Sequence, residues 1–312
     1  MFQSTFKNFN FNFNSSNEGN TVSSGDLLTG HISFDLTKPT KIRSITMSLT
    51  GGVRVYWSTG SGKNRRSHSA RLTFFDLKTV LQQDQDEAVE RPELSPGTHM
   101  YPFSCQIPQG DFPPTFNGAH GQVIYVLTVG INRPWHMAKT FQTDLNFVSR
   151  VDTSQPDLPL PLSGSNRAKT CNLWCTSGEV TLAARTEKKA FIPGETAKII
   201  CDFSNGSSKT ATLKVKLQQQ QTYYTHNRVS RRTVFKELAS EVGDPVAPYT
   251  SDQHAEVMIT IPSPLTMSIT NCSILELEYL IQVSLCVKPC TDVMVLFPIV
   301  LCDTPVEARF PF

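Results

Sequence analysis

The chain has 312 residues, which is enough for two domains that each bury a core. Its 29 Lys and Arg residues against 27 Asp and Glu residues leave a formal net charge of +2, so no global field would draw it onto nucleic acid. A hydrophobic content of 39% with 18% charged residues is typical of a soluble globular protein and excludes an intrinsically disordered one.

The sequence carries no signal for export and no membrane span. Its longest apolar run, Val293–Leu301, is about half the length of a spanning helix and contains Pro298. Near the start, Phe alternates with Asn over residues 9–14, which is unlike the apolar block of a signal peptide. We therefore expect a cytoplasmic protein, in which the sequons at Asn14, Asn205 and Asn271 are not glycosylated.

Eight cysteines are too few for a disulfide scaffold in a chain of this length, so we expect reduced thiols. Two pairs, Cys171/Cys175 and Cys286/Cys290, have a spacing that suggests zinc. No histidine is close to either pair in sequence, and structural zinc prefers ligands in tighter, paired knuckles. We expect neither a metal ion nor any other cofactor.

The first half of the chain reads as a succession of short strands. The Phe/Asn alternation over residues 9–13 predicts a first strand with an aromatic inner face, and Ser24-Gly25-Asp26 predicts a turn after it. Period-2 alternation predicts further strands at His31–Leu36, Ile42–Leu49, Val53–Trp57 and Ala70–Phe75. Residues 76–98 are polar, acidic and bounded by proline, and they support only a long loop or one short helix.

The strongest strand signal is Gly121–Trp135, which is apolar on both faces and should therefore lie in the middle of a sheet. A similar segment occurs at Leu277–Leu285. Each follows an earlier apolar segment that ends in Ile-Pro, at 107–108 and at 261–262, and a single offset aligns both pairs. We infer that the chain contains a duplication.

The second half repeats the plan of the first. Phe191-Ile192-Pro193-Gly194-Glu195 opens it, Ile199, Cys201 and Phe203 mark a strand, and a loop rich in Gly, Pro and Asp precedes a strand at Val257–Pro262. We predict an all-β protein of two tandem immunoglobulin-like sandwiches. The predicted boundaries are a first sandwich at 1–152, a Pro/Ser/Gly linker at 153–170, a second sandwich at 171–302 and a short tail at 303–312.

Motifs of catalysis are absent from the sequence. It contains no Gly-x-Ser-x-Gly elbow, no phosphate-cradling Gly-x-x-x-x-Gly-Lys and no His-Glu-x-x-His. The seven histidines are scattered singly, mostly in predicted loops. Asp84, Asp86 and Glu87 form an acidic cluster, but they lack the spaced ligand series of a calcium loop. We predict that the protein is not an enzyme.

Two basic stretches are candidate binding surfaces for phosphate groups on lipids or on phosphorylated tails. They comprise Lys63, Arg65, Arg66 and Arg71 in the first half, and Arg228, Arg231 and Arg232 in the second. The alternative is that these charges keep exposed strand edges from pairing. Arg133 and Trp135 form a third candidate, either as a contact loop or with Trp135 as a packing anchor.

Motifs along both halves carry a resemblance to a known family. The early part has Ser24-Gly25-Asp26, Arg54-Val55-Tyr56-Trp57, Gly118-x-His120-Gly121 and Asn132-Arg133-Pro134-Trp135. The later part has Trp174-Cys175-Thr176-Ser177-Gly178, Phe191-Ile192-Pro193-Gly194-Glu195, Asn271-Cys272-Ser273-Ile274 and Glu278-Tyr279. In these motifs and their spacing, the chain resembles an arrestin domain-containing protein of the α-arrestin group, within the arrestin superfamily.

The resemblance implies a cytosolic adaptor that binds transmembrane receptors or transporters as cargo at the plasma membrane and endosomes. Family members recruit ubiquitin ligases through Pro-Pro-x-Tyr motifs. The one Pro-Pro pair here, Pro113-Pro114-Thr115-Phe116, lacks the tyrosine, so we expect no ligase recruitment through such a motif. Receptor-regulating arrestins also hold a buried cluster of opposite charges that a phosphorylated receptor tail disrupts. Asp26 lies where the resemblance would put one of its acids, and it is equally suited to cap a turn.

Two other functions remain open from the sequence. One is a sorting-coat subunit of the retromer type, which shares the arrestin fold but binds fixed protein partners. The other is a redox or signalling regulator like those relatives that bind thioredoxin. That role requires an exposed reactive thiol, whereas Cys105, Cys201 and Cys272 fall on predicted strands, where burial makes a thiol inert.

Overall fold

The computed structural model describes residues 5–14, 20–83, 93–150, 152–169, 178–288 and 292–309. Backbone contacts divide the chain into two compact units. Unit 1 comprises residues 1–149 with the short segments 224–230 and 271–274, and unit 2 comprises the remainder. The described residues of both units form strands and connecting loops, and none lies in a helix of the length and hydropathy that membrane crossing requires.

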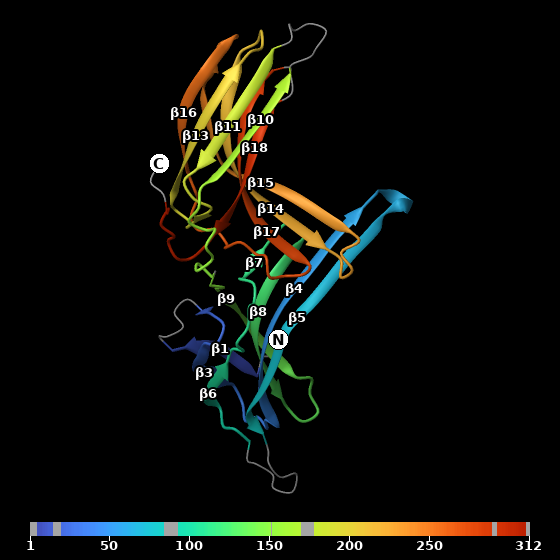
Figure 1. Cartoon of the computed structure of the whole chain (residues 1–312). Helices are drawn as coiled ribbons and strands as arrows, with labels where there is room; N and C mark the ends of the chain where they lie inside the picture. The colour runs from blue at the N-terminus through green and yellow to red at the C-terminus, as the bar shows by residue number, and fades with distance from the viewer. Residues whose placement is uncertain are drawn as a thin grey trace. The chain divides into compact units, whose positions relative to one another are not determined.

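Unit 1 is a sandwich of two sheets, one ordered β1-β3-β6 and the other β2-β9-β8-β4-β5, with β7 paired to β8 (Figure 1). Its strands are β1 (Phe6–Phe13), β2 (Thr21–Val22), β3 (Leu27–Leu36), β4 (Ser44–Thr59), β5 (Arg66–Gln83), β6 (Gly97–Gln106), β7 (Phe116–Asn117), β8 (Gly121–Asn132) and β9 (Lys139–Phe147).

Unit 2 is a second sandwich, with sheets ordered β10-β11-β13-β16 and β12-β18-β17-β14-β15 (Figure 1). Its strands are β10 (Leu162–Lys169), β11 (Glu179–Thr186), β12 (Ala190–Phe191), β13 (Thr196–Asn205), β14 (Ala211–Tyr224), β15 (Arg231–Val246), β16 (Thr250–Thr260), β17 (Leu275–Val287) and β18 (Val293–Leu301). The tandem all-β architecture predicted from alternation is confirmed.

The duplication extends to the pairing of strands. In each unit a two-residue strand, β2 or β12, pairs in parallel with the strand that follows the central one, and the other ladders are antiparallel. The central strands are β8 and β17, and each lies between two long neighbours, as the sequence of β8, apolar on both faces, predicts for that strand. Alternate side chains of both strands are fully buried in the core between the sheets.

Each central strand also carries a buried tyrosine that ties down a preceding loop. The hydroxyl of Tyr125 donates a hydrogen bond of 2.6 Å to the Pro113 carbonyl, and that of Tyr279 donates one of 2.6 Å to the Thr266 carbonyl. Gln219 Nε2 also donates to the Tyr279 hydroxyl at 3.0 Å. Burial raises the pKa of Tyr279 to about 12 and raises that of Tyr125 as well, so both phenols stay neutral donors at physiological pH.

Three polar segments that the sequence did not predict as strands are strands. Residues 76–83, expected in a loop or short helix, belong to β5, and the Gly/Pro/Asp loop expected before residue 257 overlaps the end of β15, where Gly243, Asp244 and Pro245 lie. Residues 162–169, expected in the linker, form β10 and pair along their whole length with β11. All three are edge segments, whose backbones are held by one neighbour while most side chains meet solvent, so apolar alternation is weak.

We predict that Tyr125→Phe and Tyr279→Phe each lower the free energy of unfolding by about 1–2 kcal/mol. Each change removes the hydrogen-bond donor of a loop carbonyl, at the buried Pro113 or the half-buried Thr266, while preserving the ring. Urea unfolding followed by circular dichroism measures the loss. Tyr56→Phe is the matched control, because its ring is exposed and its hydroxyl has only a 3.4 Å contact with Ser67. Equal stability of all three variants and wild type would contradict the tether.

Candidate interaction surfaces

The first basic stretch forms the tip of a long two-stranded hairpin in unit 1. The β4–β5 pairing continues to Thr59 and Arg66, beyond the point where β8 stops pairing with β4 at Val55 (Figure 1). A 3-10 turn at Gly62–Asn64 closes the hairpin, and Gly60 and Gly62 take the positive φ angles of 77° and 55° that the reversal requires. Beyond Val55 no third strand pairs with this hairpin in the described ladders, and residues 58–67 around the turn are all exposed.

The predicted basic residues are exposed but divide into two places on this hairpin. Lys63, Arg65 and Arg66 lie at the tip, and within the described residues none has an acidic side chain at ion-pair distance. Arg71 lies farther along, directly across from Arg54 on β4. These two arginines line a shallow hollow of about 160 Å³ on the outer sheet face.

The sequence analysis did not select Arg54 as a candidate. The available signal was its exposed phase between the buried Val53 and Val55, combined with the hairpin register that brings it beside Arg71. Two guanidinium groups on neighbouring strands can share one phosphate or carboxylate group.

The second basic stretch surrounds the β14–β15 turn, which joins strands equivalent to β4 and β5. Thr225 and Ser230 close this turn through the Thr225 amide, which donates to the Ser230 carbonyl at 3.0 Å. The Arg228 guanidinium lies 4.0 Å from the centre of the Tyr224 ring, so part of its surface stacks locally. Arg231 and Arg232 begin β15 and are exposed. The structure thus places the two predicted sets on two hairpins that occupy equivalent positions in the strand orders of their sheets.

Asp26 caps the turn before β3. Its carboxylate accepts a hydrogen bond of 2.7 Å from the Ser23 amide, and Gly25 has a φ of 78°. The same arrangement recurs before β13, where the Glu195 carboxylate accepts from the Ile192 amide at 2.9 Å and Gly194 has a φ of 93°. Among the described residues Asp26 has no basic partner at ion-pair distance, so its observed interaction is turn capping.

A buried pair of opposite charges is present in unit 2, where the sequence analysis did not place one. The Lys188 side chain is only 7% exposed, and its ammonium lies 2.5 Å from the Glu195 carboxylate. It also donates to the Val306 carbonyl at 2.6 Å. The sequence does contain a signal for this pair. Glu195 occupies the position in the second half that Asp26 occupies in the first, and only Glu195 has a lysine seven residues before it. The observed contacts make this pair a stabilising contact between a corner of unit 2 and its C-terminal segment.

The loop between β8 and β9 presents the third candidate. Trp135 has a relative exposure of 102%, so the interpretation of this side chain as a packing anchor is wrong. Arg133 instead packs inward, with its guanidinium 5.2 Å from the centre of the Phe6 ring. The two residues therefore have opposite roles, one holding the loop and the other extending from it.

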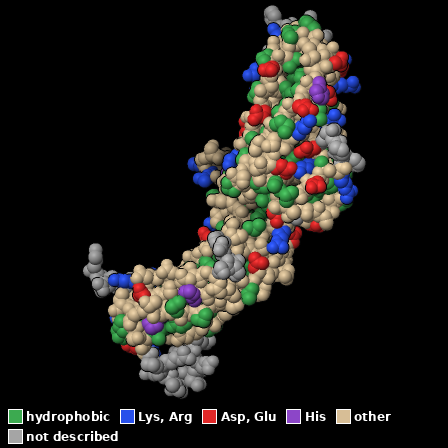
Figure 2. Space-filling model, turned by 90° about the vertical axis from the view of Figure 1, so that its left-hand side faces the viewer, with side chains coloured by type: hydrophobic (Ala, Val, Ile, Leu, Met, Phe, Trp, Pro, Cys, Tyr) green, Lys and Arg blue, Asp and Glu red, His purple; other side chains and the backbone are tan. Residues whose placement is uncertain are grey.

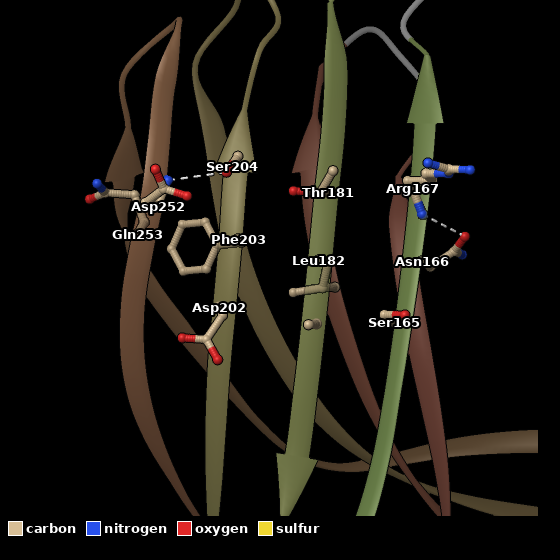
Figure 3. Close-up of a pocket in the computed structure, with 11 residues that line it drawn as sticks. Ser165, Asn166, Arg167, Thr181, Leu182, Asp202, Phe203, Ser204, Asp252 and Gln253 are labelled. Atoms are coloured by element: carbon tan, nitrogen blue, oxygen red, sulfur yellow. Dashed lines mark hydrogen bonds between the residues drawn. The ribbon is translucent and has the colours of Figure 1, made fainter.

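A hollow of about 760 Å³ on unit 2 lies on the outer face of the β10-β11-β13-β16 sheet (Figure 3). Small side chains such as Ser165 and Thr181 form its floor, with Arg167 toward one edge and Asp202 and Asp252 toward the other (Figure 3). The Asp202 carboxylate lies 2.8 Å from Nδ1 of His254. The hollow is open and polar, which suits an extended chain or a flat surface better than an enclosed small molecule.

No metal-binding group of three or more His, Cys, Asp or Glu side chains occurs in the described residues. Three of the four paired cysteines, Cys171, Cys175 and Cys290, and the acidic cluster Asp84, Asp86 and Glu87 lie outside the described residues. On the face of unit 2 visible in Figure 2, Lys and Arg side chains are interspersed with Asp and Glu. That face carries no patch of a single charge.

Comparison with known proteins agrees with this architecture. Residues 9–154 match the family described as arrestin (or S-antigen), N-terminal domain, and residues 176–306 match arrestin (or S-antigen), C-terminal domain. The arrestin domain-containing protein 4 of Mus musculus is 26% identical over 291 residues, covering 91% of this chain and 69% of the relative. The thioredoxin-interacting protein of Homo sapiens is 25% identical over 280 residues, covering 89% of this chain and 70% of the relative.

The two family matches together cover most of the chain, one for each sandwich, and the relatives span both. The protein therefore belongs to the arrestin family, and its most similar relatives here are α-arrestins.

Proposed function

We propose that the protein is a non-catalytic adaptor that binds membrane-protein cargo from the cytoplasmic side and supports its endocytosis and endosomal sorting. Membership of the arrestin family supports an adaptor. The observation that carries the proposal further is the pair of equivalent hairpins, whose turns and strand ends expose the predicted arginine and lysine side chains. Such groups are suited to phosphate groups on cargo tails or at a membrane surface.

The geometry of the first hairpin favours binding over edge protection. Charges that only blunt an edge need to lie along the strand, as Lys78 does on β5. Lys63, Arg65 and Arg66 instead gather at the turn, and within the described residues no acidic side chain neutralises them. Three unpaired cations on a projecting tip form a local positive field although the whole chain is nearly neutral.

The Pro-Pro pair supports the expectation that this site does not recruit a ubiquitin ligase. Pro113 and Pro114 are both buried, and the Pro113 carbonyl is occupied by the Tyr125 hydroxyl. A recognition motif for an aromatic groove needs an exposed, extended backbone. The segment therefore acts as part of the core of unit 1 rather than as a docking peptide.

We predict that the quadruple variant Arg65→Glu, Arg66→Glu, Arg231→Glu and Arg232→Glu binds anionic vesicles or phosphorylated cargo peptides at least about tenfold more weakly. Each basic residue near an anionic surface contributes about 1 kcal/mol, and reversal replaces attraction by repulsion. Vesicle co-sedimentation and peptide titration measure the loss. A control with four exposed lysines reversed away from the tips, Lys78, Lys169, Lys209 and Lys288, has the same net charge. Unchanged binding of the hairpin variant, or equal loss in the control, would overturn the role of the hairpins.

Proximity labelling in cells tests the adaptor function itself. We expect the labelled proteins to be dominated by plasma-membrane proteins and endosomal sorting factors. A labelled set without either group would contradict the proposal. A single stoichiometric complex on size-exclusion chromatography would instead favour a sorting-coat subunit.

Similarity to thioredoxin-interacting protein raises a second candidate, a thiol-dependent regulator. The described cysteines argue against it. Cys105, Cys201, Cys272 and Cys302 are buried, and only Cys286 is partly exposed. Burial raises the pKa of the Cys201 thiol to about 12 and also raises those of Cys105, Cys286 and Cys302, which disfavours the reactive thiolate. Cys272 was predicted on a strand but lies in the loop before β17, where it is nevertheless buried.

We predict that Cys105, Cys201 and Cys302 resist alkylation by iodoacetamide in the native protein at pH 7.5 and react fully after denaturation. Their burial and raised pKa values both suppress attack. Mass analysis of peptides after timed alkylation measures this, with the denatured chain as the control for full reactivity. Rapid native labelling of any of the three would revive the redox candidate.

A further inference from the structure

The β8–β9 loop exposes two large apolar side chains that are two positions apart in the sequence. Trp135 and Met137 have relative exposures of 102% and 93%, the two highest among the exposed large hydrophobic side chains of the described residues. Single exposed apolar residues are ordinary on protein surfaces. A fully exposed tryptophan with a methionine two residues away forms an apolar tip, and an exposed apolar patch of this kind is typical of an interaction site.

This exposure does not come from a loose loop, because its base is fixed. The Asn132 carbonyl accepts a hydrogen bond of 2.8 Å from the Arg43 amide, and the Asn132 side chain donates to the Ser44 hydroxyl at 2.9 Å. Arg133 then packs over the Phe6 ring of the opposite sheet. The loop therefore leaves the sandwich in a defined direction.

The turn itself holds the indole outward. The His136 amide donates to the Arg133 carbonyl at 3.4 Å, with Pro134 and Trp135 as the two central residues, and Trp135 has a φ of 61°. This is the sign of φ that a type II turn needs at its third position, where glycine is preferred. A bulky side chain in this region is strained, and such strain is concentrated at functional sites. Stability alone would favour glycine over tryptophan here.

The charges around the tip are basic. Lys139 follows the two apolar residues and is exposed at the start of β9. Arg133 precedes them but packs inward over Phe6, and no Asp or Glu occurs in the sequence between Asp111 and Asp144. An apolar tip beside an exposed lysine matches the boundary between the headgroups and the acyl chains of an anionic lipid bilayer.

We propose that Trp135 and Met137 insert into the interfacial region of an anionic membrane, with the exposed Lys139 at the headgroups. Tryptophan is favoured at that depth because its ring is apolar and its N–H can reach polar partners. The site is separate from the basic hairpin within unit 1. Since β8 runs antiparallel to β4, with Asn132 opposite Ser44 and Gly121 opposite Val55, the loop and the hairpin tip lie at opposite ends of the sheet.

The inference does not depend on the cargo function, and pure lipid tests it. The probe is vesicles of phosphatidylcholine with phosphatidylserine, half of them containing brominated acyl chains. We expect wild-type protein to bind and its tryptophan fluorescence to shift to the blue and be quenched by bromine. Trp135→Gly and Met137→Ser should each bind at least tenfold more weakly. A background with Trp57→Phe and Trp174→Phe leaves Trp135 as the one tryptophan of the chain, so that the shift and the quenching report on it alone.

Tyr249→Gly is the matched control, because Tyr249 follows Pro248 in the turn between β15 and β16, is exposed and has a φ of 56°. It should bind vesicles like wild type. Thermal melting checks folding, and Trp135→Gly should melt no lower than wild type since glycine accepts the positive φ. Absence of vesicle binding by wild type, unquenched Trp135 or wild-type binding by Trp135→Gly would overturn the proposal. Loss of recruitment in cells with unchanged vesicle binding would also overturn it, in favour of a protein partner.

Discussion

The central strand of each sandwich imposes the constraint on which the rest of the fold depends. β8 and β17 each carry an alternating row of buried apolar side chains, so each is stable only with a strand on either side and with its inner face against a second sheet. The buried tyrosine of each strand adds a fixed point, because its hydroxyl ties the preceding loop across the end of the core. The two hairpins and the β8–β9 loop extend from strands of these sheets, so the central strands also determine where they lie.

Strands buried in the core could be predicted from the sequence because their pattern reports their environment. Val123, Tyr125 and Leu127 alternate with smaller residues in the pattern that the structure shows as buried and half-buried. Edge strands have no such pattern. β10 contains Ser163-Gly164-Ser165, which looks like a linker, yet every residue from Leu162 to Lys169 pairs with β11. At such an edge, backbone pairing with the neighbouring strand determines the conformation more than the side chains do. The local sequence does not show which strand that neighbour will be.

The candidate surfaces could be predicted in part for the same reason. Charge and turn residues locate a basic hairpin tip, and Lys63, Arg65 and Arg66 do lie on one. Register is needed to see that Arg71 leaves the tip to face Arg54. Tryptophan is more often packed than exposed, so sequence alone favours an anchor at position 135. The positive φ of that residue turns the indole out of the core, and the residue type does not predict such a backbone conformation.

The first and last segments of unit 2 lie next to each other. Leu158, before its first strand, packs with Val306, after its last, and the Arg309 amide donates to the Pro159 carbonyl at 3.1 Å. Entry and exit of the chain thus meet at one point, where the buried Lys188 secures the exit segment. A module whose two ends lie together can be joined to another module by short connections without opening its sheets.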